Sequence, residues 1–345
     1  MVHKVNQVEA SAATLDAKVA FLRRPGSYAE ELERVEAIET HMSWVFLTGE
    51  HAYKLKKPVR YDFLDFSTLE ARRADCEEEV RLNQRLAGDV YLGVARLTAT
   101  PQGTLALDGT GRVVEWLVRM RQLPRERMLD RALAAETVTA AELTSLGERL
   151  GRFYRSLPPV ALPPPGFRGR LERDIAGCAS ELERAEYALD GVRARKLAAE
   201  MLSFVDREAA LLELRERTGK VVEGHGDLRP EHACLLDEPV IIDCVEFNRD
   251  FRIVDAAEDL AFLALECERL GHPEAGGAVL ASYSRAAADT IPPRLLEFYF
   301  AVRAFIRAKI AAWRTRDASP AEREGWLDRT EQYLALAKRH LARAG

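Results

Sequence analysis

The chain has 345 residues, of which 47% are hydrophobic and 30% are charged. This length and composition allow a full core and two lobes or domains, which excludes disorder of the whole chain. Basic and acidic residues are interleaved, and the formal net charge is only −5. Because nonspecific nucleic-acid binders are usually basic, we expect no nucleic-acid partner.

The sequence contains neither an apolar segment typical of a signal peptide nor the ~20 consecutive apolar residues that span a bilayer. We therefore expect a cytoplasmic protein with no membrane partner. The five cysteines are odd in number, lie far apart and show no C-x-x-C spacing, which argues against a disulfide framework or a structural zinc site. We expect them to be reduced and mostly buried. The oligomeric state is not indicated by the sequence.

The first 37 residues show an alternation of apolar and charged residues with helical period, broken at Pro25-Gly26. We expect residues 1–37 to form accessory N-terminal helices.

Residues 38–124 have the pattern of a small antiparallel sheet that carries one helix. Two β-rich runs, WVFL and HAYKLK, flank a turn signal at Gly49. A charged helix follows, which Ser67 or Thr68 opens and Gly88 ends. Further strand-like runs complete this region.

Residues 125–345 are mainly helical, with a proline-rich interruption at 157–166 and one β-like island at 221–247. The two regions together predict an α+β protein with a small antiparallel-sheet N-lobe and a larger helical C-lobe. No internal repeat and no GxxxxGK[ST] phosphate loop occur.

The island carries the main chemical signal, H-G-D-L-R-P-E-H at 225–232, followed by a strand-like V-I-I-D that ends at Asp243. The pattern predicts Asp227 and Asp243 at the ends of two short strands of one hairpin. Phosphoryl transfer needs one carboxylate to orient the attacking hydroxyl and accept its proton, and a second to hold the metal that neutralises the phosphates. The two aspartates match these roles.

This segment resembles the catalytic loop of the kinase-like superfamily, and in its H-G-D form it is similar to that of aminoglycoside phosphotransferases and choline-kinase-like enzymes. The resemblance implies that Asp227 is the catalytic base, that Arg229 steadies the transferring phosphate and that Asp243 binds the metal. At the position where the family has a metal-binding Asn, this chain has His232. Three roles are open for His232: a changed metal preference towards manganese, a hydrogen bond, or weakened catalysis.

The same resemblance implies a nucleotide site in the N-lobe. A lysine from the HAYKLK strand should reach the phosphates of ATP, and both Lys54 and Lys56 are candidates because they lie on one face of that strand. Glu79 is the best-placed partner on the helix that follows, with Glu77 and Glu78 as alternatives. Met120 to Leu123 resembles the hinge that receives adenine, whereas the turn near 40–43 lacks the G-x-G-x-x-G of protein kinases.

Across residues 30–315, the sequence resembles a bacterial group of uncharacterised aminoglycoside-phosphotransferase family enzymes, some of them fused to a second ATP-binding domain, which we do not expect here. The resemblance implies a two-lobed protein-kinase-like fold and an ATP-dependent kinase that uses Mg²⁺, with Mn²⁺ as an alternative. A hydroxyl of a small molecule would be the acceptor. The identity of that molecule is not implied.

Three alternatives stay open. A nucleotide-binding pseudokinase with a regulatory role would account for His232. A protein kinase would need an activation segment with an A-P-E-like anchor, which we do not find after Asp243. A metal-dependent hydrolase would use His225, Asp227, His232 and Asp243 as ligands, and would make the lysine and glutamate pattern a coincidence.

For several further polar residues, the sequence allows two alternative roles. His225 and Asp259 are expected to hold the catalytic loop or cap a helix rather than react. Glu246 is either a neighbour of the metal ligands or a solvated loop acid. Arg303 and Arg307 share one face of a late helix, with Lys309 nearby, and either pair with acids or line an acceptor site for an anionic substrate.

Overall fold

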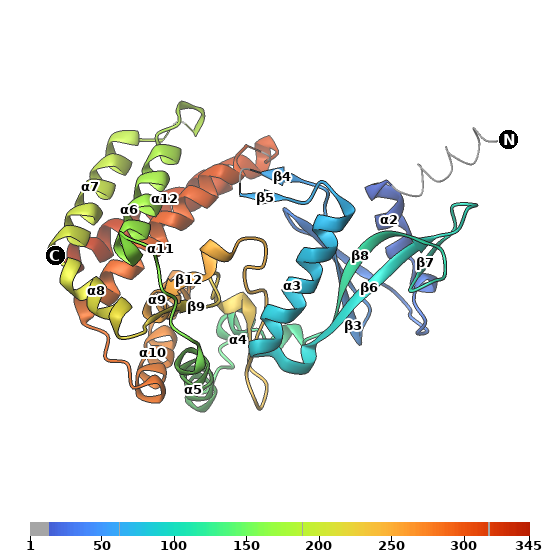
Figure 1. Ribbon diagram of the computed structural model, residues 1–345, viewed down its shortest axis with the longest axis horizontal. Helices are drawn as coiled ribbons and strands as arrows, with labels where there is room; N and C mark the ends of the chain where they lie inside the picture. Colours follow the sequence, from blue (N-terminus) through green and yellow to red (C-terminus); the bar gives the residue numbers. More distant parts are fainter. Residues whose placement is uncertain (1–13, 62, 188, 317) are drawn as a thin grey trace. The chain divides into compact units, whose positions relative to one another are not determined.

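The computed structural model describes residues 14–61, 63–187, 189–316 and 318–345 (Figure 1). It forms two compact units. Unit 1 contains the residues up to Arg127 together with Val240–Arg249, and unit 2 contains Met128–Pro239 and Asp250–Gly345.

Unit 1 is built on a six-stranded antiparallel sheet with the strand order β1-β2-β3-β8-β6-β7. Its strands are β1 (Glu36–Glu39), β2 (Ser43–Leu47), β3 (His51–Lys56), β6 (Tyr91–Ala99), β7 (Leu105–Leu107) and β8 (Arg112–Arg121). The remaining short strands of the unit are β4 (Arg60–Tyr61), β5 (Leu64–Asp65) and β11 (Val240–Ile241). Helix α3 (Leu69–Ala87) packs on β6 and β8 (Figure 1).

The β2–β3 hairpin turns at Gly49, as its sequence predicts, with a φ of 90° that favours glycine. In the strand that follows, the side chains of Lys54 and Lys56 lie on one face because their spacing is two residues. Helix α3 also begins and ends as expected, since the Thr68 side chain accepts from the Ala71 amide and Gly88 is the C-cap.

The expectation of a second N-terminal helix before residue 37 is wrong. The chain forms α2 (Leu15–Leu22) and a 3-10 turn, η1 (Pro25–Ser27), but Glu36–Glu39 is strand β1, in which Ile38 pairs with Val45 of β2. Strand pairing here overrides a local pattern that favours helix. Residues 1–13 of the expected accessory helices lie outside the described residues.

The core of unit 1 lies between the sheet and α2. Phe46, Leu55, Leu97 and Leu117 are fully buried in it, and Leu22 of α2 closes one side. Fully burying a side chain of this size stabilises a fold by about 1.5–3 kcal/mol, so this packing fixes the strand that carries the two lysines.

Unit 2 is mainly helical, and the α+β class with a curled antiparallel sheet and a larger helical part is confirmed. Its helices are α4 (Leu129–Ala134), α5 (Ala140–Ser156), α6 (Gly166–Leu182), α7 (Gly191–Arg207), α8 (Ala209–Arg217), α9 (Ala256–Arg269), α10 (Pro273–Ala287), α11 (Pro293–Arg314) and α12 (Pro320–Ala344). Helices α11 and α12 pack on each other, as do α5 and α10 (Figure 1).

Two short strands, β9 (Val221–Glu223) and β12 (Ile253–Asp255), pair antiparallel and lead into the functional loop and into α9. A third strand, β10 (Ala233–Cys234), follows that loop. Asp255 caps α9 by accepting from the Ala257 amide and also accepts from buried Arg215 at 2.6 and 2.7 Å. Because a buried carboxylate needs partners, this pairing fixes the start of α9.

The packing of α10 on α9 gives a matched stability test with two neighbouring glycines. A methyl group at Gly276 would lie 2.7 Å from Cα of Ala264 on α9, whereas one at Gly277 would meet nothing within 4 Å. We expect Gly276→Ala to destabilise the protein by about 1–3 kcal/mol, because the two helices must separate. Gly277→Ala should stabilise it by about 0.5–1 kcal/mol through helix propensity. Denaturant unfolding measures both, and equal effects of the two substitutions would contradict the close approach of the helices.

Candidate active site

Three predicted residues meet in unit 1. The Lys54 ammonium on β3 donates to Oε1 of Glu79 on α3 at 2.9 Å and to Oδ1 of Asp243 at 2.8 Å. Glu79 is fully buried, whereas the Asp243 side chain is 43% exposed. The structure thus joins the strand lysine, the helix glutamate and the aspartate that follows β11, which the sequence separates by up to 189 residues.

Lys56 also reaches Glu79, but in a different environment. Its ammonium has no exposed surface and lies 2.7 Å from Oε2 of Glu79, 2.5 Å from Oδ2 of Asp75 and 2.5 Å from Oε1 of Glu246. Lys54, in contrast, retains 14% exposure of its side chain. The two lysines therefore share one carboxylate, and only Lys54 presents part of its side chain to solvent.

The carboxylates control the protonation of both lysines. Burial alone would lower the pKa of each ammonium, but the acidic side chains around it outweigh burial. Asp243 and Glu79 raise the pKa of Lys54 well above its ordinary value, and Glu246 and Glu79 do the same for Lys56. Both lysines are therefore held as cations.

The backbone at Asp243 has an unusual conformation, and hydrogen bonds to neighbouring side chains hold it in place. Asp243 has a φ of 61°, in the left-handed region that non-glycine residues seldom adopt. Its amide lies 3.2 Å from the Tyr91 hydroxyl, and the amide of Cys244 donates to Oδ1 of Asn83 at 2.9 Å. Such strained residues persist where their surroundings fix them, and they concentrate at functional sites.

Asp75 and Glu246 were not assigned these contacts from the sequence. Glu246 is not a solvated loop acid, because it is largely buried and pairs with Lys56, and its role as a neighbour of the metal ligands stays a prediction. Asp75 lies one helical turn before Glu79, which is a spacing that the sequence does display. The position of Glu246 carries no comparable local signal.

The proposed hinge lies at the end of β8. Met120 is buried within the strand and is paired on both sides, with Ala52 of β3 and Tyr91 of β6. Leu123 follows the strand, and the preceding Gln122 amide donates to the Glu50 carbonyl at 2.8 Å. Of the two residues expected to receive adenine, Met120 and Leu123, it is Leu123 whose backbone lies outside the hydrogen-bonded ladder of the sheet.

The H-G-D loop lies in unit 2. Asp227 accepts from Nε of Arg229 at 3.1 Å and from Nη2 at 2.8 Å, and Arg229 also pairs with Glu231. Burial would raise the pKa of Asp227, but the charges of Arg229, of His232 in its protonated form and of Arg307, in that order, hold it at about 2. The carboxylate is therefore ionised throughout the physiological pH range.

Asp259 holds this loop from α9. Fully buried, it accepts from the amides of His225 at 2.8 Å and Gly226 at 3.0 Å, and from the Tyr154 hydroxyl at 2.8 Å. The bracing role expected for Asp259 is confirmed, while the helix cap is Asp255. Gly226 has a φ of 85°, and a Cβ there would lie 2.6 Å from the Phe251 carbonyl oxygen, so the loop requires glycine.

His232 has a hydrogen-bond partner at each ring nitrogen. Nδ1 lies 2.8 Å from the carbonyl oxygen of Asp227, and Nε2 lies 3.2 Å from Nη2 of Arg229. Because a carbonyl only accepts and a guanidinium only donates, this geometry fits the neutral tautomer with the proton on Nδ1. Among the three roles open for His232, it favours the hydrogen bond.

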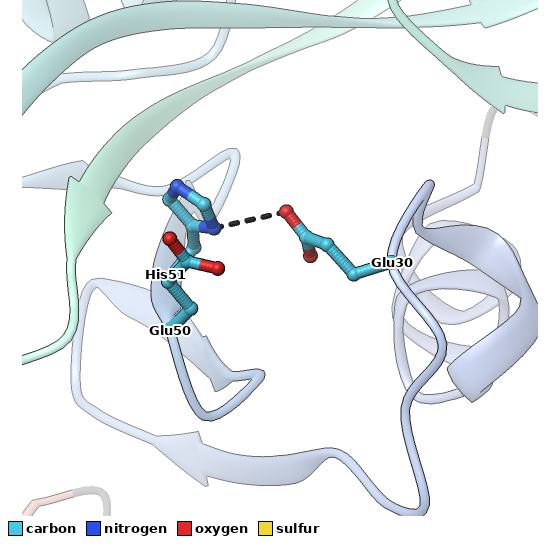
Figure 2. A group of neighbouring side chains, drawn as sticks. All are labelled: Glu30, Glu50 and His51. Atoms are coloured by element: carbon cyan, nitrogen blue, oxygen red, sulfur yellow. Dashed lines mark ion pairs between the residues drawn. The ribbon is translucent and has the colours of Figure 1, made fainter.

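Figure 2 shows a group of ligand-type side chains that the sequence analysis did not single out. Glu30, Glu50 and His51 each place one potential ligand atom within 4.8 Å of the others, and Nδ1 of His51 lies 3.0 Å from Oε1 of Glu30. Glu50 lies on the β2–β3 turn, His51 begins β3, and Glu30 lies in the segment before β1. The ion pair accounts for the approach of Glu30 to His51.

A family model described as "Phosphotransferase enzyme family" matches residues 60–298. The chain belongs to this family. The match covers the H-G-D loop, Asp243 and Glu79, and it begins after the lysine strand. The resemblance seen in the sequence is thereby confirmed.

Curated relatives match the chain over most of its length. The uncharacterized protein Rv2004c of Mycobacterium tuberculosis is 34% identical over 313 residues, which cover 90% of this chain and 60% of that protein. The chain thus spans about 60% of the length of the curated relatives it matches.

Two solved structures are similar across nearly the whole phosphotransferase chain. One is the GDP complex of aminoglycoside 2'-phosphotransferase-IIIa, with a TM-score of 0.56 at 14% identity, covering 96% of this chain and 99% of that one. The other is the choline kinase LicA from Streptococcus pneumoniae, with a TM-score of 0.55 at 14% identity, covering 93% and 99%. These matches confirm the two-lobed protein-kinase-like fold.

Within the described part of the phosphotransferase, no helix combines the length and apolar character needed to cross a bilayer.

The environment of Lys56 predicts that its ammonium stabilises the fold by neutralising the buried carboxylates around it. Lys56→Ala would leave Asp75, Glu79 and Glu246 with ligand atoms within 4.8 Å of one another, and Lys54, which binds the other oxygen of Glu79, would not replace the cation shared by all three. We expect a loss of about 3–5 kcal/mol in the free energy of unfolding. Millimolar Ca²⁺ should restore part of it, because a hard cation prefers clustered carboxylate oxygens. Thermal unfolding without nucleotide, at about pH 8 where isolated carboxyls are ionised, measures both effects.

Lys57→Ala is the matched control, since Lys57 pairs with the largely exposed Glu39. It should cost no more than about 1 kcal/mol and gain no response to Ca²⁺. A Ca²⁺ response of Lys56→Ala no larger than that of the wild type would count against the cation role.

Proposed function

We propose that this phosphotransferase is a small-molecule kinase that transfers the γ-phosphoryl group of ATP to a hydroxyl of its acceptor. The observation that carries the proposal is the Lys54 ammonium bound to both Glu79 and Asp243 in unit 1. A lysine, its helix glutamate and a metal-binding aspartate are the parts that kinase-like enzymes need to hold a triphosphate. One similar structure is a GDP complex, which supports a nucleotide site.

Lys54 is the better candidate for the phosphate lysine. Lys56 is fully buried and its ammonium is surrounded by three carboxylates, so it could reach a phosphate only by leaving all three. Lys54 keeps part of its side chain exposed and contacts Asp243. Exchanging the Asp243 contact for a phosphate oxygen would preserve its charge balance.

Asp227 would orient the acceptor hydroxyl and accept its proton as the phosphoryl group transfers. With a pKa of about 2 it is a weak base, so its contribution would come mainly from orientation. This suits phosphoryl transfer, in which positioning and charge neutralisation provide most of the rate enhancement. Arg229 would hold the Asp227 carboxylate through its two donors and balance its charge.

Asp243 would bind Mg²⁺, since an exposed carboxylate is a suitable ligand for a hard cation. When bound, the metal would neutralise the phosphate charge. His232 was predicted as a second metal position, but its ring nitrogens already have partners, so we assign it the support of Asp227 and Arg229. Mn²⁺ remains the alternative metal if His232 were to exchange those partners.

Adenine would bind to the backbone around Leu123, which lies beyond the paired part of β8, whereas Met120 would contribute only through packing. A cytoplasmic location, with no nucleic-acid or membrane partner, stays a prediction from the sequence.

The first test is ATP consumption by the purified chain against sugars, sugar acids, amino alcohols, nucleosides and aminoglycosides, with Mg²⁺ and Mn²⁺ in parallel. We expect acceptor-dependent turnover that falls by about 10²–10⁴-fold in Asp227→Asn, the range typical of a lost general base, with nucleotide affinity retained. Lys54→Met should raise the KM for ATP and lower kcat.

A result in which nucleotide binds but no acceptor is phosphorylated with either metal would instead favour a pseudokinase. Turnover that survives Asp227→Asn unchanged would remove the assigned role of that residue.

The electrostatics of the loop predict a shift in pH dependence. Arg229 is the main cation that lowers the pKa of Asp227, and burial opposes it. In Arg229→Gln burial should dominate, so the pKa of Asp227 rises and activity is lost as the pH falls through a range in which the wild type stays ionised. The profile of kcat/KM against pH, which reports the free enzyme, measures this. Arg229→Lys keeps the charge and should shift the acid limb less, and coincident limbs in all three proteins would disprove the coupling.

A further inference from the structure

The inner face of α11 presents two arginines one helical turn apart. Arg303 and Arg307 both lie over the ring of Phe262 on α9, with their guanidinium carbons 5.3 and 5.9 Å from its centroid. Because they share this ring, the two side chains point to the same side of the helix.

Arg303 has a carboxylate partner, although its Nε, like that of Arg307, makes no well-aligned hydrogen bond. Its Nε lies 2.9 Å from Oε1 of Glu258, and its Nη1 donates to the carbonyl of Gly226 at 3.3 Å. Gly226 directly precedes Asp227 in the loop, so this bond brings the arginine face of α11 up to the H-G-D loop.

Arg307 differs from Arg303. Nothing in residues 14–61, 63–187, 189–316 and 318–345 offers it an ion pair, and its Nε is buried without a hydrogen-bond partner. Its guanidinium lies between the rings of Phe262 and Tyr333, 5.9 and 5.7 Å from their centroids. The Tyr333 hydroxyl donates to Glu266 at 2.6 Å, which fixes that ring. Arg307 is therefore held in place by aromatic contacts, with its Nε donor unsatisfied.

Other interior guanidiniums of the chain show what is unusual about Arg307. Each is paired with a carboxylate: Arg72 with Glu115, Arg215 with Asp255, Arg252 with Glu223 and Arg269 with Glu266. A buried donor without a partner costs about 1–3 kcal/mol, so an unpaired one calls for a ligand or a functional reason.

Arg307 also acts on the reacting carboxylate. Burial opposes it, but the Arg307 charge is among those that lower the pKa of Asp227. The nearer Arg229 is occupied by Asp227 itself and by Glu231. Within the described part of unit 2, Arg307 is thus the arginine beside the loop that has an unsatisfied donor and no carboxylate partner.

We propose that Arg307 binds an anionic group, a carboxylate or phosphate, of the acceptor whose hydroxyl Asp227 orients. The inference rests on the proposed function and names its substrate class: a small hydroxy acid or phosphate ester. A guanidinium suits this task because its planar donors match a carboxylate or phosphate in two parallel hydrogen bonds. A polyamine acceptor such as an aminoglycoside would meet repulsion at this position.

The same chemistry allows a second source of the anion, the transferring γ-phosphate of ATP. In that case Arg307 would act on every acceptor equally. Matched acceptor pairs that differ in one charge separate the two sources: glucose and glucuronate, glycerol and glycerate, serinol and serine.

The experiment compares wild type, Arg307→Gln and Arg294→Gln on these pairs, by turnover and by calorimetric binding with a nonhydrolysable ATP analogue present. Arg294 is the control, because it lies on the same helix in an exposed pair with Glu208. We expect the wild type to prefer the anionic member of at least one pair. Arg307→Gln should lose that preference by roughly 10- to 100-fold, the range for a charged hydrogen bond, mainly through KM. Arg294→Gln should keep it.

Two outcomes overturn the inference. One is a wild type that neither binds nor phosphorylates the anionic members in preference to the neutral ones. The other is an equal loss of kcat on both members in Arg307→Gln, which would assign the arginine to the γ-phosphate. Anion binding that depends on Arg307 without any turnover would support the inference while removing the proposed kinase activity, so the two failures are distinguishable.

Discussion

A single buried carboxylate, Glu79, receives both lysines of strand β3, and the arrangement of unit 1 depends on it. Oε1 binds Lys54 and Oε2 binds Lys56, so neither oxygen is left without a cation. An uncompensated charge at this depth would be strongly unfavourable. Glu79 therefore fixes α3 against the sheet, while Asp243 and Glu246 tie the segment after β11 to the same two lysines. One ion-pair network connects the three parts of the chain from which the nucleotide site is proposed.

In unit 2, a buried carboxylate also fixes part of the chain, here by accepting hydrogen bonds from two backbone amides. Asp259 is fully buried and accepts hydrogen bonds from the backbone amides of the H-G-D loop. The conformation of the loop therefore does not depend on the side chain of Asp227. The left-handed glycine at position 226 allows the approach to Phe251. Asp227 is then left to interact with arginines, which keep it ionised. A rigid backbone with one charged and partly accessible side chain is what orientation of an acceptor requires.

Much of this was accessible from local patterns. The turn at Gly49, the helix between Thr68 and Gly88, and the pairing of Lys54 with Glu79 follow from turn chemistry, capping and period-two spacing joined to a known motif. The strand at Glu36–Glu39 was predicted as helix, because its sequence has helical character and only pairing with β2 makes it a strand. The pairing of Glu246 was not predicted for a related reason: its partner, Lys56, is 190 residues away in the sequence.

The sequence by itself determined the α+β class and the phosphotransferase family and named the acids and lysines of the candidate site, since these depend on residue type, order and local period. Only the tertiary structure distinguished Lys54 from Lys56, because the two lie on one face of one strand and differ solely in what surrounds them. It also separated Arg303, which is paired with Glu258, from Arg307, which has no such partner in the described residues. Burial and ion pairing between distant segments are properties of the folded chain, and no local pattern encodes them.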